Sequence, residues 1–79
     1  SLDPFEMAAE DLMLGMRMSR GISDSMLEDA TLLLPDAPLA FRELESDGLV
    51  SHCGSRWIPT EKGWLFGNCL YGRLFDLAP

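Results

Sequence analysis

The chain has 79 residues, enough for one domain at most, and a domain of this size buries only about 60% of the surface that its unfolded chain exposes. With 47% hydrophobic residues and a formal net charge of -7, it is apolar enough to fold, and its acidity disfavours a polyanionic partner. Its longest apolar runs, such as Leu32–Leu34, fall far short of the roughly 18 residues of a membrane span, and no signal peptide is visible, so we expect a cytoplasmic protein without a membrane partner.

Two further features of the sequence are its first residues and the spacing of its cysteines. The chain begins Ser1-Leu2 without an initiator methionine, which we interpret as the end of an excised or processed piece. Cys53 and Cys69 lie 16 positions apart, a spacing that fits neither a CxxC redox motif nor a paired zinc knuckle. We expect two reduced, partly buried thiols, and the sequence leaves a disulfide between them open.

The first predicted helix runs from Pro4 to about Ser19. Asp3 is its N-cap, Pro4 takes the first position, where a missing N–H costs nothing, and Gly21 ends it. One apolar stripe of this helix consists of Phe5, Ala8, Ala9, Leu12 and Met16. A second, nearly opposite, consists of Met7, Leu14 and Met18. We therefore expect this helix to be contacted on two sides.

Two shorter helices follow and predict a helix-turn-helix. Ser23 is a suitable N-cap for a helix from Asp24 to Leu33. The next helix runs from about Pro38 to Asp47, and Gly48 stands where a left-handed C-cap residue belongs. Its core positions are spaced i, i+3, i+4 and i+7 and are Ala37, Ala40, Phe41 and Leu44.

The last part predicts a small wing and one long helix. Strands at 49–53 and 56–58 flank a turn at Gly54-Ser55, and Pro59 stops the ladder. Thr60 caps a helix of roughly 61–76, which two glycines, Gly63 and Gly72, weaken by about 1 kcal/mol each. We expect its core line to be Phe66, Leu70, Leu74 and Leu77. The predicted fold is mainly α with a small β-hairpin, in the order of a winged helix-turn-helix.

The tract from Glu10 to Ile22, with its Met-Leu-Gly-Met-Arg and Arg-Gly-Ile sequences, resembles the opening of a known accessory domain. This is the C-terminal domain of oxygen-independent coproporphyrinogen III oxidases and related haem chaperones, the HemN/HemW group. Met16 stands where that family often has Leu. Two further short sequences, Asp-Gly-Leu-Val at 47–50 and Pro-Thr-Glu-Lys-Gly at 59–63, the latter followed by Asn68, extend the resemblance over most of the chain. Both short sequences also occur widely in winged-helix regulators.

The resemblance implies that residues 1–79 are the C-terminal accessory domain of a radical S-adenosylmethionine protein of the coproporphyrinogen III oxidase kind. Such a domain would pack on the catalytic barrel of the same chain and help to cover the substrate. The CxxxCxxC motif that holds the family's [4Fe-4S] cluster is absent here, so the cluster and S-adenosylmethionine would bind elsewhere in the parent. We expect no catalytic residue, metal or cofactor in this piece, and either an oxidase or a haem-chaperone parent fits.

Apolar side chains outside the expected core form a candidate docking surface for the barrel or for a second copy in a homodimer. They share stripes on the first and last helices and are Met7, Leu14, Met18, Trp64, Tyr71 and Phe75. The alternative is that wing residues such as Val50 and Trp57 cover the stripe on the last helix.

Two further groups have a functional and a structural interpretation. Arg17 and Arg20 suit the carboxylates of a tetrapyrrole, and they equally suit the negative end of a helix, which we favour. His52 and Cys53 could ligate haem or a metal, but one pair on a hairpin lacks a ligand set, and we favour an ordinary strand histidine and a packed thiol.

A winged-helix DNA-binding regulator or protein-interaction module is the competing hypothesis. The helix that would read DNA offers Arg42 against Glu43, Glu45 and Asp47. Because phosphate contacts require Lys or Arg, this charge pattern disfavours nucleic acid as a partner.

Overall fold

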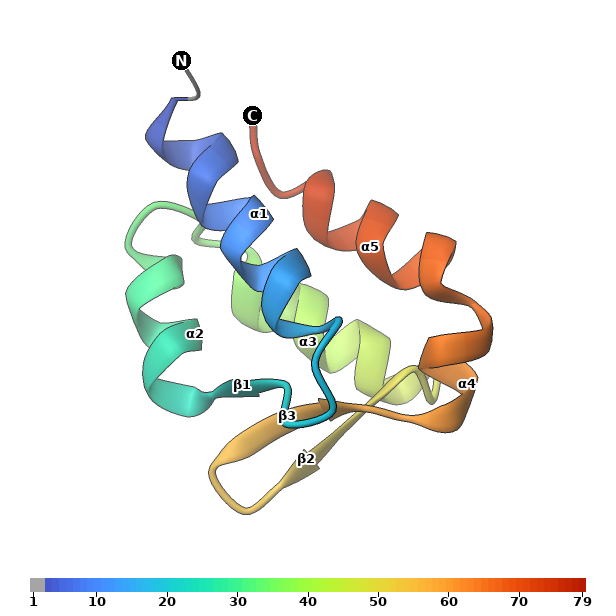
Figure 1. The fold of residues 1–79 in the computed structure, drawn as a ribbon. Helices are drawn as coiled ribbons and strands as arrows, with labels where there is room; N and C mark the ends of the chain where they lie inside the picture. Colours follow the sequence, from blue (N-terminus) through green and yellow to red (C-terminus); the bar gives the residue numbers. More distant parts are fainter. Residues whose placement is uncertain (1–2) are drawn as a thin grey trace.

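Five helices and three short strands make up residues 3–79, the part of the chain that the computed structural model describes (Figure 1). In chain order they are α1 (Pro4–Gly15), β1 (Ile22–Ser23), α2 (Asp24–Thr31), α3 (Ala37–Ser46), β2 (Val50–Cys53), β3 (Arg56–Pro59), α4 (Glu61–Leu65) and α5 (Gly67–Phe75). The interpretation of Ser1-Leu2 as an excised end lies outside these residues. None of the helices described is long and apolar enough to cross a membrane.

Helix α1 begins as predicted but ends earlier. The amide of Glu6 donates to Asp3 Oδ1 at 2.7 Å, which confirms the cap. The prediction that the helix reaches Ser19 is wrong, because the chain leaves α1 after Gly15 and tightens through i, i+3 hydrogen bonds. Gly15 allows this turn: a Cβ there would lie 2.3 Å from Ile22 Cγ2, so the returning chain occupies the space of a side chain.

Helices α2 and α3 follow the predicted pattern. Ser23 Oγ accepts a hydrogen bond from the Met26 amide at 3.1 Å, and Gly48 has the expected positive φ of 79°. Helix α2 ends at Thr31 rather than Leu33, since the following residues turn into α3. The four predicted core positions of α3 are all buried, namely Ala37, Ala40, Phe41 and Leu44.

The sheet has three antiparallel strands in the order β1-β3-β2, and Figure 1 shows it at one end of the molecule. The hairpin of β2 and β3 is confirmed, with Gly54 in the turn at φ 61°. Pro59 is the last paired residue, opposite Val50. Strand β1 was not predicted, because its two residues form a strand only by pairing with Trp57 and Arg56 far along the chain.

The prediction of one continuous last helix is wrong. Phe66 has φ −111° and ψ 43°, so the helix breaks there into α4 and α5. Thr60 caps α4 as predicted, with its Oγ1 accepting from the Gly63 amide at 3.0 Å. Phe66 was expected in the core and is 52% exposed, since the break turns it outward, whereas Leu70 and Leu74 are fully buried.

One core joins the helices to the inner face of the sheet. Its largest buried side chains include Phe41, Leu12, Met16, Ile22, Leu34, Leu70, Leu74 and Val50. Trp57 of β3 packs on Phe41 with ring centroids 5.6 Å apart. The fold is therefore mainly helical with a small three-stranded antiparallel sheet.

Both cysteines are free and exposed. The expectation that the thiols are partly buried is therefore wrong, because each lies on an outer face.

Candidate functional site

Helices α1 and α5 lie side by side and run in opposite directions, so that the start of α1 and the end of α5 lie at the same end of the pair (Figure 1). Leu70 and Leu74 point from α5 into the core. The residues that follow each of them, Tyr71 and Phe75, lie about 100° further round the helix and face α1. This pairing brings together two of the apolar stripes predicted from the sequence.

The outer side of this helix pair is strongly apolar. The exposed fractions are 53% for Met7, 51% for Leu14, 63% for Met18 and 59% for Phe75, while Tyr71 is half-buried. Val50 and Trp57 are buried in the core, so the alternative in which the wing covers this stripe is wrong.

A hollow of about 290 Å³ opens between α1 and α5, lined by Glu10, Met13, Leu14, Arg17 and Phe75. The guanidinium carbon of Arg17 lies 4.9 Å from the centroid of the Tyr71 ring, a cation–π geometry. The hollow thus combines an apolar wall with one cation and one carboxylate. We call Leu14, Arg17 and Phe75, together with the half-buried Tyr71 and with Met18 in the turn after α1, the α1/α5 face.

Two other predicted site residues lie apart from this hollow. Trp64 is 46% exposed, but it belongs to α4, so the break at Phe66 interrupts the stripe that was expected to join it to Tyr71. Arg20 lies in the turn after α1, where its carbonyl oxygen accepts from Arg56 Nε at 2.8 Å. Because α1 ends at Gly15, neither Arg17 nor Arg20 lies in its last turn. The expected interaction of these arginines with the negative end of the helix is therefore wrong, and Arg17 instead lies over the Tyr71 ring.

His52 and Cys53 occupy the hairpin. His52 Nε2 donates to Asp24 Oδ1 at 2.7 Å, and its ring stacks on Trp57 with centroids 4.1 Å apart. Asp24 could not be predicted as the partner of His52, because the two residues are 28 positions apart. Neighbouring residues of a strand point to opposite sides, so these two cannot converge on one ion. Within residues 3–79 no three His, Cys, Asp or Glu side chains form a metal-binding group.

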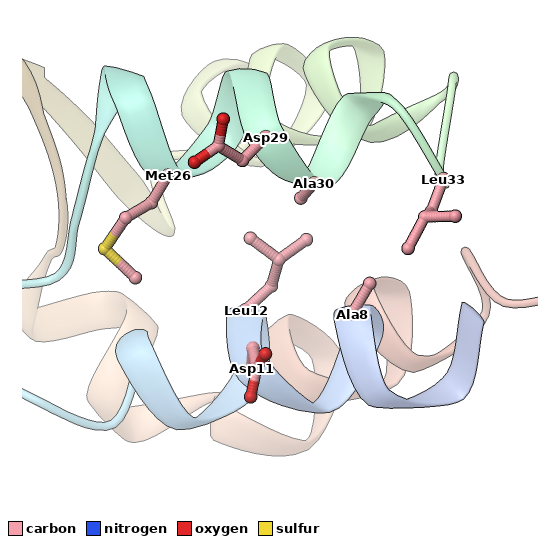
Figure 2. Close-up of a pocket in the computed structure, with 7 residues that line it drawn as sticks. All are labelled: Ala8, Asp11, Leu12, Met26, Asp29, Ala30 and Leu33. Carbon is pink, nitrogen blue, oxygen red and sulfur yellow. The ribbon is translucent and has the colours of Figure 1, made fainter. Parts of the chain in front are cut away.

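A second hollow, of about 300 Å³, lies between α1 and α2, on the other side of α1 (Figure 2). Figure 2 shows Ala8 and Leu12 pointing from α1 toward α2, with Ala30 and Leu33 facing them. The complete lining is Ala8, Asp11, Leu12, Met26, Asp29, Ala30 and Leu33. This site could not be predicted from the sequence, because its two walls meet only through tertiary packing; the small residues Ala8 and Ala30 were the available signal.

The comparisons with known proteins give one family. The family model described as HemN C-terminal domain matches residues 2–66, most of the chain. The chain belongs to this family. The HemN C-terminal domain match covers α1 through α4 and stops at the helix break, so α5, with Tyr71 and Phe75, lies beyond it. No curated protein and no solved structure matches the chain.

Proposed function

We propose that this chain is the non-catalytic C-terminal accessory domain of a coproporphyrinogen III oxidase-like radical S-adenosylmethionine protein, and that it packs on the catalytic barrel through the α1/α5 face. The observation that carries the proposal is the HemN C-terminal domain match over residues 2–66. In the parent, the [4Fe-4S] cluster and S-adenosylmethionine would be bound outside this domain, because the chain has no CxxxCxxC motif.

The fold is consistent with a winged helix. The order of elements from α1 to β3 supports this assignment, in which α2 and α3 would be the helix-turn-helix and the β2–β3 hairpin the wing. Strand β1 adds to the same sheet between the first two helices. The broken last helix is an addition to this arrangement, and it supplies half of the α1/α5 face.

The exposure of the α1/α5 face supports docking. Leu14, Met18 and Phe75 each expose more than half of their surface, and side chains of this size expose roughly 100 Å² each under those conditions. Leu14 and Phe75 line the same hollow and so form one apolar patch, and such a patch on a small domain is commonly an interaction site. The hollow beside Phe75 would accept an apolar side chain of the barrel, with Arg17 free to pair with a carboxylate at its edge.

The same geometry bears on contact with a tetrapyrrole substrate. Arg17 lines the hollow of the α1/α5 face, whereas Arg20 does not. If the face meets the barrel near its substrate, Arg17 is the better of the two predicted partners for a propionate carboxylate. The proposal that this domain helps to cover the substrate rests on its resemblance to the family and on no contact described here.

DNA binding receives no support from the described surface. Arg42 of α3 is exposed, but it shares a hollow of about 230 Å³ with Asp24 and Glu28 of α2. Glu43 forms an ion pair with Arg73 Nη2 at 3.0 Å, which uses one more cation of this side. A phosphate backbone approaching α3 would meet more carboxylates than guanidinium groups.

The test uses the segment encoded upstream of Ser1. It should contain CxxxCxxC, and the purified segment should bind the 79-residue chain in titration calorimetry. Phe75→Arg should weaken that binding more than ten-fold, because it removes roughly 100 Å² of apolar contact, worth about 2 kcal/mol. Leu39→Arg is the control, since Leu39 is 56% exposed on α3 and does not line the hollow between α1 and α5. An upstream segment without the motif, or equal losses for the two variants, would overturn the proposal.

A further inference from the structure

We propose that the hollow between α1 and α2 binds a cationic amphipathic helix of a partner polypeptide. The site is distinct from the α1/α5 face, because the two hollows share no lining residue and their α1 residues lie on opposite sides of the helix. The proposal therefore stands or fails independently of docking on a barrel.

The floor of the hollow is apolar and incompletely filled. Leu12 is 2% exposed and forms its base, while Ala8 and Ala30 are too small to close the space above it. Met26 and Leu33 line it with exposed fractions of 44% and 38%. The space of about 300 Å³ between these side chains suits one or two apolar side chains of an incoming helix.

The apolar lining on this side follows α2 and continues past its end. Met26 and Ala30 lie one turn apart on α2, and Leu33 lies in the turn that follows the helix. A helix that presents apolar residues at i, i+3 or i+4, and i+7 matches such a lining, as in other helix-in-groove complexes.

The charge of the walls selects a cation. Asp11 on α1 and Asp29 on α2 are exposed, one on each wall, and no Lys or Arg lines the hollow. Neither carboxylate forms an ion pair within residues 3–79. Asp24 and Glu28 lie on the same helix as Asp29, and the whole chain has a net charge of -7. A partner helix with Lys or Arg beside its apolar positions is therefore complementary, and an acidic one is repelled.

A second copy of the chain lacks this chemistry. Among the described helices, α1 and α2 contain no Lys or Arg, and α3, α4 and α5 contain one each, namely Arg42, Lys62 and Arg73. No helix of the chain offers two cations around an apolar stripe. The occupant we infer is accordingly a different polypeptide.

The experiment uses a synthetic amphipathic helix of leucine and lysine, labelled with a fluorophore, and measures its binding to the 79-residue chain by anisotropy. A peptide with glutamate in place of every lysine is the probe control. The lysine peptide should bind, more weakly at high salt, and the glutamate peptide should not.

Matched variants locate the site. The double variant D11N and D29N should weaken binding about five-fold, as expected for two exposed charge pairs. The double variant E45Q and D47N makes the same change of charge at the far end of α3 and should change it less than about two-fold. Met26→Gln should weaken binding, whereas Leu39→Gln, also an exposed apolar residue, should not.

Equal losses for the two charge variants would mean general attraction to an acidic protein and would overturn the proposal. The proposal would also be overturned if the lysine peptide did not bind or if the glutamate peptide bound equally well. It would be overturned as well if self-association of the chain blocked the site and prevented binding of the lysine peptide. All the substituted residues are exposed, so circular dichroism should show an unchanged fold.

Discussion

Two glycines of the last helical region should respond in opposite ways to the same substitution. Gly63 in α4 is buried, and a Cβ built on it would lie 2.1 Å from the carbonyl oxygen of Leu49. Gly72 in α5 is exposed, and nothing lies within 4 Å of its Cβ position. Helix propensity alone favours Ala over Gly at both sites by about 1 kcal/mol.

The magnitude at Gly63 follows from its neighbours. Ordinary contact begins near 3.4 Å, so α4 and the Leu49 backbone must separate by about 1.3 Å. The Leu49 carbonyl accepts from the Thr60 amide at 3.1 Å, and Thr60 caps α4 through Gly63 itself. Losing these two hydrogen bonds costs about 1 kcal/mol each, and the displaced packing a further 1–3 kcal/mol or so. After the gain in propensity, Gly63→Ala should destabilise the fold by about 2–4 kcal/mol.

Urea unfolding followed by far-UV circular dichroism measures both variants. Gly72→Ala should raise the free energy of unfolding by about 1 kcal/mol. A fall of about 2–4 kcal/mol for Gly63→Ala is a large part of the roughly 4–12 kcal/mol expected for a chain of 79 residues. If Gly63→Ala is neutral or stabilising, the close approach of α4 to Leu49 is not a feature of the folded protein.

Four further outcomes are expected. Phe75→Ala should change stability by less than about 1 kcal/mol and Leu74→Ala should lower it by about 2–5 kcal/mol in urea unfolding, because the first is 59% exposed and the second fully buried; similar losses would contradict an uncovered Phe75. His52→Ala should cost about 1 kcal/mol in the same assay, since the ring stacks on Trp57, and a neutral effect would show that the stack contributes nothing. Duplex DNA should not be retarded at low salt, and sub-micromolar binding that weakens with salt would restore the regulator hypothesis. Elemental analysis and a haem titration should find no stoichiometric iron, zinc or haem, and a haem spectrum lost in His52→Ala would refute this.

Local signals in the sequence predicted most of the helix starts. Asp3, Ser23 and Thr60 are each followed within three residues by the amide that they bond, so the sequence contains both partners of every cap. The period of apolar residues likewise identified the core side of α3 and, in Ala9, Leu12 and Met16, most of the core side of α1. These features depend on residues within one or two turns of each other.

Features that depend on distant residues could not be predicted. Strand β1 exists because Ile22 pairs with Trp57, and the break at Phe66 lets α4 approach Leu49 while α5 packs on α1. Both features depend on tertiary contacts, and at Phe66 these contacts override a continuous helical pattern. The candidate sites show the same difference. The apolar stripes could be predicted from the sequence, but the hollows could not, because they depend on how far α1 lies from α5 and from α2.

The two tryptophans give the protein a built-in pair of optical reporters. Trp57 is 7% exposed and lies between the rings of His52 and Phe41, whereas Trp64 is 46% exposed on α4. Emission from Trp57 should be blue-shifted and inaccessible to iodide, and emission from Trp64 should be red-shifted and readily quenched. A Trp64→Phe variant would thus leave Trp57 as the single emitter. Its emission maximum should shift on unfolding and should change little when a partner binds at the surface. A Trp57→Phe variant would do the reverse, so one chain can distinguish loss of structure from arrival of a partner near α4.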